Sequence, residues 1–268
     1  MKNTKFNTII IFTAFFIFLN SLTGCVETST DTDKHIFNDK VKVKGVVLKH
    51  KRTIQIEDAK NYGKFEVEVH HGNLEIAGGK NYSLEVEVYE KTENDLVLTF
   101  KDGILTGKTK SGKPFAIGNI KGTLPNSINV TIDSGAGNVN FSDFNSQNFN
   151  LNLGAGNINI KNCDLNSIIA NTGAGNIDID ELNSQNLDIN TGAGNIELSE
   201  VSSTEIVCNS GVGNIKAYNS VAEDVEFSTG IGNISTSDCR FKKKDLSTGL
   251  GRVKENKEKY KKSDAIEI

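Results

Sequence analysis

The chain has 268 residues and a formal net charge of −4 at pH 7, with 25 glycines, two prolines and no tryptophan. Its length allows one good-sized domain or two small ones. Its charge balance is mildly acidic, so the chain as a whole lacks the basic character of a nucleic-acid-binding protein, and nucleic acid is not an expected partner.

Residues 1–24 have the pattern of a lipoprotein signal peptide. A positively charged start precedes an apolar run from residue 9 to residue 19, which is too short for a membrane-spanning helix of about 20 residues. Leu22, Thr23 and Gly24 then precede Cys25. This motif resembles the bacterial lipobox, which implies an acylated Cys25 and an exported chain anchored to the outer face of the cell membrane. An ordinary signal peptide followed by an unrelated cysteine is the alternative.

Two irregular segments follow the signal peptide. Residues 25–35 are polar and lack an apolar pattern, so we expect a flexible tether. Residues 36–115 are rich in strand patterns; for example, Phe65, Val67 and Val69 alternate with polar residues, and a period of two is typical of a β-strand. We interpret residues 36–115 as an irregular β-rich part that caps the repeat described next, with a separate small β-sandwich as the alternative.

Residues 116–253 contain a 19-residue repeat, whose positions we number from its first glycine. Position 1 is Gly135, Gly154, Gly173, Gly192, Gly211, Gly230 and Gly249. Position 3 is Gly137, Gly156, Gly175, Gly194, Gly213, Gly232 and Gly251. Position 4 is Asn138, Asn157, Asn176, Asn195, Asn214 and Asn233, and then Arg252. A degenerate copy, Gly118-Asn119-Ile120, lies one full period upstream of the first complete unit.

Each unit holds two short runs in which apolar residues alternate with polar ones. A unit of this size cannot bury its apolar face alone, but stacked units can, because each strand pairs in parallel with its copies above and below. We therefore predict an all-β, single-stranded parallel β-solenoid with about eight rungs. Its inward columns include Val139, Ile158, Ile177, Ile196, Ile215 and Ile234; Phe149, Ile168, Leu187, Ile206 and Val225; and Leu151, Ala170, Ile189, Cys208, Phe227 and Leu246.

The glycine-rich heptad is interpreted as a structural corner of the solenoid. Glycine permits positive φ in a tight turn, and asparagine tolerates left-handed geometry and can stack into an amide ladder. A phosphate loop would require a strand–glycine–helix context and is normally present once. A calcium-binding repeat would require a nine-residue period and carboxylate ligands. Neither pattern fits, so no metal or other cofactor is expected.

The register also places the cysteines that follow Cys25. Cys163 and Cys239 occupy the same position four rungs apart, about 19 Å at the usual strand spacing, which is too far for a disulfide. Cys208 lies in an inward column. All three are predicted to be buried free thiols.

The G-[AS]-G-[ND]-[IV] rungs, entered through Thr123–Val139, resemble the bacterial DUF4097/DUF2807 β-strand-repeat family, whose members are often labelled "putative adhesin". The resemblance covers about residues 40–253. It implies a right-handed parallel β-solenoid exposed at the cell envelope, in some relatives near envelope-stress systems. The family has no agreed catalytic residues, so none is carried over. The last unit departs from the pattern at Arg252.

One pair of acids is a candidate for catalysis. Stacking places Asp178 and Glu197 about 5 Å apart, the separation of a retaining glycosidase pair. Lys216 follows on the next rung and offsets the charge of the two acids. This arrangement favours a solvated column of ion pairs, and we predict that the protein is not an enzyme. A polysaccharide-active enzyme is therefore the least favoured function.

Residues 254–268 form a charged C-terminal cap or tail. Charged residues commonly protect an exposed strand edge, and a second interpretation is binding of a polyanion by Lys257, Lys259, Lys261 and Lys262. The favoured function is a lipid-anchored binding, adhesin-like or scaffold module at the cell envelope, with a cell-wall polymer or an envelope protein as partner. An envelope-stress sensor with a protein partner is the main alternative.

Overall fold

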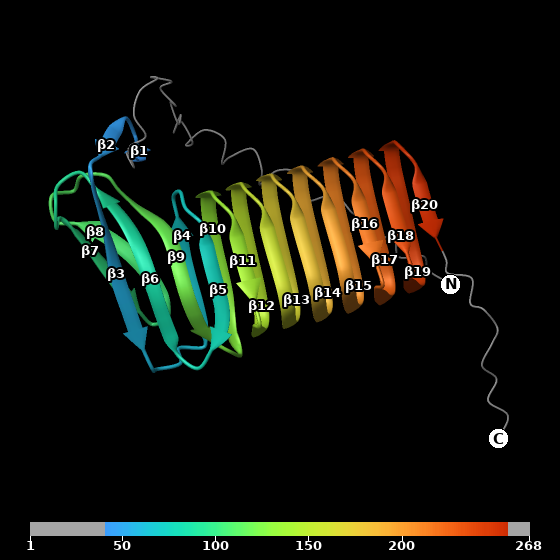
Figure 1. Ribbon diagram of the computed structural model, residues 1–268, viewed down its shortest axis with the longest axis horizontal. Helices are drawn as coiled ribbons and strands as arrows, with labels where there is room; N and C mark the ends of the chain where they lie inside the picture. Colours follow the sequence, from blue (N-terminus) through green and yellow to red (C-terminus); the bar gives the residue numbers. More distant parts are fainter. Residues whose placement is uncertain (1–40, 257–268) are drawn as a thin grey trace, which may run out of the picture.

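The computed structural model describes residues 41–256, and this part of the chain is built from β-strands and turns (Figure 1). Between residues 41 and 256 there is no helix that could span a membrane. Residues 1–40 and 257–268 lie outside the described residues. The signal peptide, the lipobox, Cys25, the tether and the four tail lysines are therefore predictions that rest on the sequence alone.

Seven long parallel strands stack in register, each offset from the next by one repeat of the sequence. Ile158 pairs with Ile177, and Ile177 pairs with Ile196. The predicted parallel β-solenoid is confirmed, with about seven coils. Its strands are β10 (Ile128–Ala136), β11 (Val139–Ser142), β12 (Asn145–Ala155), β13 (Ile158–Ala174), β14 (Ile177–Ala193), β15 (Ile196–Val212), β16 (Ile215–Tyr218), β17 (Val221–Ile231), β18 (Ile234–Ser237), β19 (Arg240–Leu250) and β20 (Val253–Asn256).

Each coil has three sides rather than two. In the coil that begins at Ile177, burial alternates over three separate runs, at positions 5–7, 10–12 and 15–19. At least two successive positions that are not buried separate one run from the next, and the glycine corner contributes four (positions 1–4). The chain therefore turns at three places per coil. Position 10 supplies an inward column that the sequence pattern did not reveal: Phe144, Cys163, Leu182, Val201 and Ser220.

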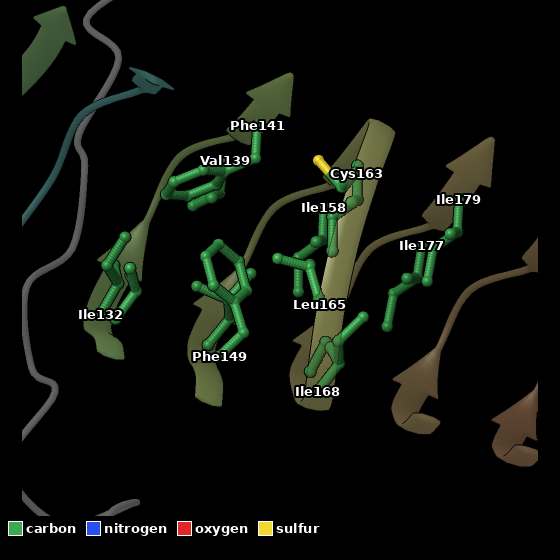
Figure 2. Packing of buried hydrophobic residues seen from close by; sticks show 14 of the residues in the cluster. Ile132, Val139, Phe141, Phe149, Ile158, Cys163, Leu165, Ile168, Ile177 and Ile179 are labelled. Atoms are coloured by element: carbon green, nitrogen blue, oxygen red, sulfur yellow. The ribbon is translucent and has the colours of Figure 1, made fainter. Parts of the chain in front are cut away.

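The inward residues of successive coils form continuous apolar columns. Val139, Ile158 and Ile177 follow one another along the stack, as do Phe149 and Ile168 (Figure 2). All five are at most 1% exposed. Burial of one such side chain contributes about 1.5–3 kcal/mol before conformational entropy is subtracted. The repeat therefore holds together because an apolar residue recurs at the same position of every unit.

The first coil of the stack rests on a segment far away in the sequence. β4 (Lys64–Val69) and β5 (Leu74–Gly79) pair in parallel with β10 and β11, so that Leu74 lies against Val139. The other edge of β5 pairs with β9 (Phe115–Pro125), which places Ile120 against Leu74. The degenerate copy Gly118-Asn119-Ile120 therefore does not lie directly below the first complete unit, because the β4–β5 rung lies between them.

The N-terminal end of the stack is closed by antiparallel strands. β6 pairs antiparallel with β3 and β9, and β7 pairs antiparallel with β8. These strands share one continuous sheet and one hydrophobic core with the solenoid, so they do not form a separate β-sandwich. The remaining strands are β1 (Val41–Val43), β2 (Val46–Leu48), β3 (His50–Asp58), β6 (Tyr82–Glu90), β7 (Leu96–Lys101) and β8 (Ile104–Thr109).

Candidate functional site

The two glycines of each heptad serve different purposes. The third-position glycines from Gly137 to Gly232 have φ between +131° and +159°. A Cβ at Gly175 would lie 1.9 Å from the backbone oxygen of Gly156 on the preceding coil. The first-position glycine Gly173 does not have positive φ, contrary to expectation. Its role is close approach, because a Cβ there would lie 2.5 Å from the oxygen of Gly154.

The corner asparagines bind the backbone of the next coil. The backbone N–H of Asn176 donates to Oδ1 of Asn157 at 2.8 Å, and that of Asn195 donates to Oδ1 of Asn176 at 2.8 Å. None of the corner asparagines has positive φ, so the expectation of left-handed geometry was wrong for them. Each amide instead satisfies a turn N–H that strand pairing leaves free, and this keeps the coils in register.

A second asparagine ladder runs along position 18. Nδ2 of Asn171 donates to Oδ1 of Asn152 at 2.9 Å, and the same contact repeats at 3.0 Å from Asn190 to Asn171 and from Asn209 to Asn190. Each amide is partly buried and has its partners on adjacent coils. These side chains are therefore committed to the fold and are poorly placed to bind a ligand.

Left-handed geometry occurs instead at a second corner, position 9. The residues there have φ between +48° and +55°; they are Asp143, Asn162, Glu181, Glu200, Asn219 and Asp238. A groove of about 420 Å³ follows this corner, with Asp143, Glu181 and Glu200 on its rim and Cys163 and Leu182 at its base. Within residues 41–256, no group of three or more His, Cys, Asp or Glu side chains could hold a metal ion.

The acids considered for catalysis are stacked side by side. Asp178 pairs with Glu197 across β14 and β15, and Glu197 pairs with Lys216. Lys216 Nζ lies 3.5 Å from Glu197 Oε2. Burial raises the pKa of Asp178, and the charges of Glu197 and Asp180 raise it further. A glycosidase pair must flank the scissile bond, whereas these two carboxylates project from one sheet face and one of them is in an ion pair.

One carboxylate in the described region is completely buried, and its partners are all internal. Glu90 accepts hydrogen bonds from the backbone N–H groups of Leu96 at 2.6 Å and Asn94 at 2.8 Å. It also forms an ion pair with Arg52, whose Nε lies 2.9 Å from Glu90 Oε1. Burial raises the pKa of Glu90, but the backbone donors and Arg52 together outweigh it and leave the pKa lowered. Glu90 therefore fixes the β6–β7 turn.

The three described cysteines are free thiols. Cys163 and Cys208 are buried, as predicted, but Cys239 is half-buried, so the prediction of burial is wrong for Cys239. Burial raises the pKa of Cys163 to about 11 and raises that of Cys208 further. A thiol with so high a pKa has little thiolate at neutral pH, so these cysteines are poor nucleophiles.

The last coil ends the solenoid with charged side chains at inward positions. Lys244 continues the column of Val225, and Glu255 continues that of Thr236. The two side chains form an ion pair across the end of the core. Lys242 and Lys243 lie 3.7 Å and 3.6 Å from carboxylates of the preceding coil. Inward charges of this kind protect a strand edge from pairing with another chain.

These features define a parallel β-solenoid with glycine corners, polar ladders and a capped end. The chain belongs to the Toastrack DUF4097 family, whose model matches residues 26–211 and 186–266. The resemblance inferred from the repeat is thus confirmed. No curated protein matches the chain.

Solved structures share the fold at low sequence identity. A "putative adhesin" from Bacteroides fragilis is 19% identical with a TM-score of 0.50, over 76% of this chain and 97% of its own. A "putative cell adhesion protein" from Clostridium sporogenes is 16% identical with a TM-score of 0.33, over 78% and 99%. A "putative lipid binding protein" from Parabacteroides distasonis is 16% identical with a TM-score of 0.39, over 76% and 96%.

Proposed function

We propose that this protein is a lipid-anchored, non-catalytic binding module at the outer face of the cell membrane. The observation that carries the proposal is the stack of 19-residue coils, which presents the same outward positions repeatedly along one axis. Solenoids use such extended surfaces for binding. The Bacteroides fragilis protein with the same fold bears the name of an adhesin, and adhesion to an envelope surface is the activity we propose.

The anchor is supported by the sequence. Leu22, Thr23 and Gly24 precede Cys25 after a short apolar run, and the described fold begins soon afterwards, at Val41. A Cys25→Ser variant should leave the membrane fraction or keep its signal peptide. A variant that is processed and fractionates like the wild type would refute the anchor. Cys163→Ser is the matched control, because it also removes one thiol but leaves the lipobox unchanged.

The proposed ligand is an anionic component of the envelope, bound near the C-terminus. Lys257, Lys259, Lys261 and Lys262 follow a last coil that is itself basic. Changing these four lysines to glutamine should weaken retention on anionic vesicles or polyphosphate. Wild-type retention should fall as salt rises above about 0.15 M, where charges are screened within about 8 Å. If wild-type retention does not depend on salt and the glutamine variant is retained equally well, these lysines serve only to cap the solenoid.

The alternative is a sensor of envelope stress with one protein partner, built from the same parts. Crosslinking on intact cells separates the two functions. A single crosslinked envelope protein would favour the sensor, whereas attachment to lipid or wall material would favour the binding module. Catalysis on polysaccharide is disfavoured because Glu197, one member of the acid pair, is in an ion pair with Lys216.

A further inference from the structure

Exposed aliphatic side chains gather at the C-terminal end of the solenoid. Within residues 41–256, six of the eight exposed large hydrophobic residues follow residue 211. Three of them occupy position 2 on successive coils: Val212 and Ile231 are each 52% exposed, and Leu250 is 68% exposed. We call these three residues the aliphatic ridge. They end strands β15, β17 and β19, and the usual strand spacing places them about 5 Å apart.

The ridge is not required by the fold. Position 2 is alanine in the four preceding coils, from Ala136 to Ala193, and these alanines stack in the same register. Each ridge residue lies between two glycines, and more than half of its surface is exposed. The larger side chains therefore appear only over the last three coils and project outward, where burial in the core does not explain them.

The coil that carries Leu250 is also the most basic part of the described chain. Residues 240–256 contain six cationic and two acidic side chains, a net charge of +4, although the whole chain has a net charge of −4. Leu250, Arg252 and Lys254 are alternate residues, and all three are exposed. Among the described residues, neither Arg252 nor Lys254 forms an ion pair. Two free cations thus lie beside the end of the ridge.

We propose that this end of the solenoid docks on an anionic lipid bilayer, with the aliphatic ridge inserted among the acyl chains and Arg252 and Lys254 at the headgroups. Exposed aliphatic residues bordered by cations are the combination by which soluble surfaces bind anionic membranes. A charged wall polymer would satisfy the cations but leave the ridge in water. Docking against the same end of a second copy would bring together two surfaces that each have a net charge of +4. In addition, three side chains bury far less surface area than a stable dimer interface needs.

The proposal rests on the proposed function, because the lipid anchor places the protein at a membrane. The segment from Cys25 to Val41 spans at most about 55 Å when extended. The eight parallel strands from β4 to β19 cover seven intervals, about 34 Å. β1, which begins at Val41, contacts β9, and β9 pairs with β5 one strand spacing beyond the parallel stack, which adds about 5–10 Å. The segment is therefore long enough for the anchor and the far end of the stack (Figure 1) to reach one bilayer at the same time.

The test uses the chain without its signal peptide and with Cys25→Ser, so that no acyl group contributes. Flotation with phosphatidylcholine vesicles, with and without phosphatidylglycerol, measures binding. The ridge variant is Val212→Ala, Ile231→Ala and Leu250→Ala combined, which extends the natural alanine column and should melt like the wild type. Ile169→Ala, at an exposed aliphatic residue on another side of the stack, is the matched control.

The ridge variant should bind anionic vesicles at least tenfold more weakly, at low and at high salt, whereas the control binds normally. Changing Arg252 and Lys254 to glutamine should remove the preference for phosphatidylglycerol. A ridge variant that floats like the wild type overturns the proposal. The proposal is also overturned if the wild type is a dimer and the ridge variant is a monomer. It is overturned as well if the wild type is retained on polyphosphate but does not float with vesicles. This last result would leave the proposed anion-binding function intact, whereas membrane fractionation of the acylatable protein tests the anchor separately.

Discussion

The corner glycine at position 3 gives the sharpest test of how the solenoid is held together. Gly175 has φ of +154°, which side chains with a Cβ rarely adopt. A Cβ there would lie 1.9 Å from the backbone oxygen of Gly156 and 2.5 Å from its carbonyl carbon. Backbone atoms of the preceding coil cannot move aside as a flexible side chain can. Gly175→Val should therefore force the two coils apart at the corner.

The expected cost has two parts. Forcing extra atoms into a packed contact costs about 1–3 kcal/mol, and positive φ costs a further 1–2 kcal/mol or so for a residue with a Cβ. A loss of about 3 kcal/mol corresponds to a fall in melting temperature of about 6–12 °C for a domain of this size. Asp178→Ala should cost almost nothing, because Asp178 is exposed and repelled by Glu197.

The decisive comparison is Ala174→Val, one residue away. It introduces the same side chain at position 2, where Val212 stands on a later coil with 52% of its surface exposed. Its melting temperature should stay within about 2 °C of the wild type, as is usual for a surface substitution. Melting is followed by circular dichroism at several scan rates. Equal melting temperatures for Gly175→Val and Ala174→Val would refute the reasoning.

Three further predictions concern stability and reactivity. Glu90→Gln should lower the free energy of unfolding by about 2–3 kcal/mol at pH 7. Because the pKa of Glu90 is lowered by folding, the difference should shrink as pH falls below about 4; a constant difference in urea titrations would contradict this. The buried Cys163 and Cys208 should react with a thiol reagent only after denaturation, whereas the half-buried Cys239 should react first; rapid labelling of Cys163 or Cys208 in the native protein, seen in a mass spectrum, would contradict their burial. Replacing Lys244 with leucine and Glu255 with valine should expose an apolar end and cause association, and a monomer in light scattering would count against the charged cap.

The fold was predictable because the 19-residue interval is both the period of the sequence repeat and the offset between paired strands. In a parallel in-register stack, every residue lies above its own copy, so the sequence alone predicts a column such as Ile158, Ile177 and Ile196. The same logic placed Asp178 against Glu197 and Cys208 in the core. No such regularity identifies a ligand, because binding residues need not repeat.

Other features could not be predicted for specific physical reasons. The third side of each coil was missed because position 12 is Ser184 and Ser203 in the middle coils, which interrupts the apolar alternation. Glu181 and Glu200 carry no turn signal at position 9, yet Glu181 adopts φ of +55°. The asparagine or aspartate at this position in the other four coils was the signal that could have revealed the corner. The partners of the β4–β5 rung could not be identified from the sequence, because they come from two distant segments and sequence spacing reports only local neighbours.

The aliphatic ridge was present in the sequence but carried no signal there. Val212, Ile231 and Leu250 occupy position 2 of a repeat in which that position is otherwise alanine, and nothing in the residue types distinguishes an exposed position from a buried one. Their exposed fractions, 52%, 52% and 68%, became informative only when the corner was seen to project from the stack. Exposure of a large apolar group is a three-dimensional property that residue type does not reveal.

The β4–β5 rung imposes an order on folding. Phe65 pairs with Val130, which comes much later in the chain, so this pair forms only after β10 has been synthesised. Every subsequent coil pairs with the coil that precedes it in the sequence. Closing the longer loop costs about 1 kcal/mol more in chain entropy. Since synthesis delivers the N-terminus first, we expect one slow nucleating closure at the β4–β10 contact, followed by rapid zippering toward β20. Destabilising changes in β4 should therefore slow refolding, and equal changes in β17 should mainly accelerate unfolding.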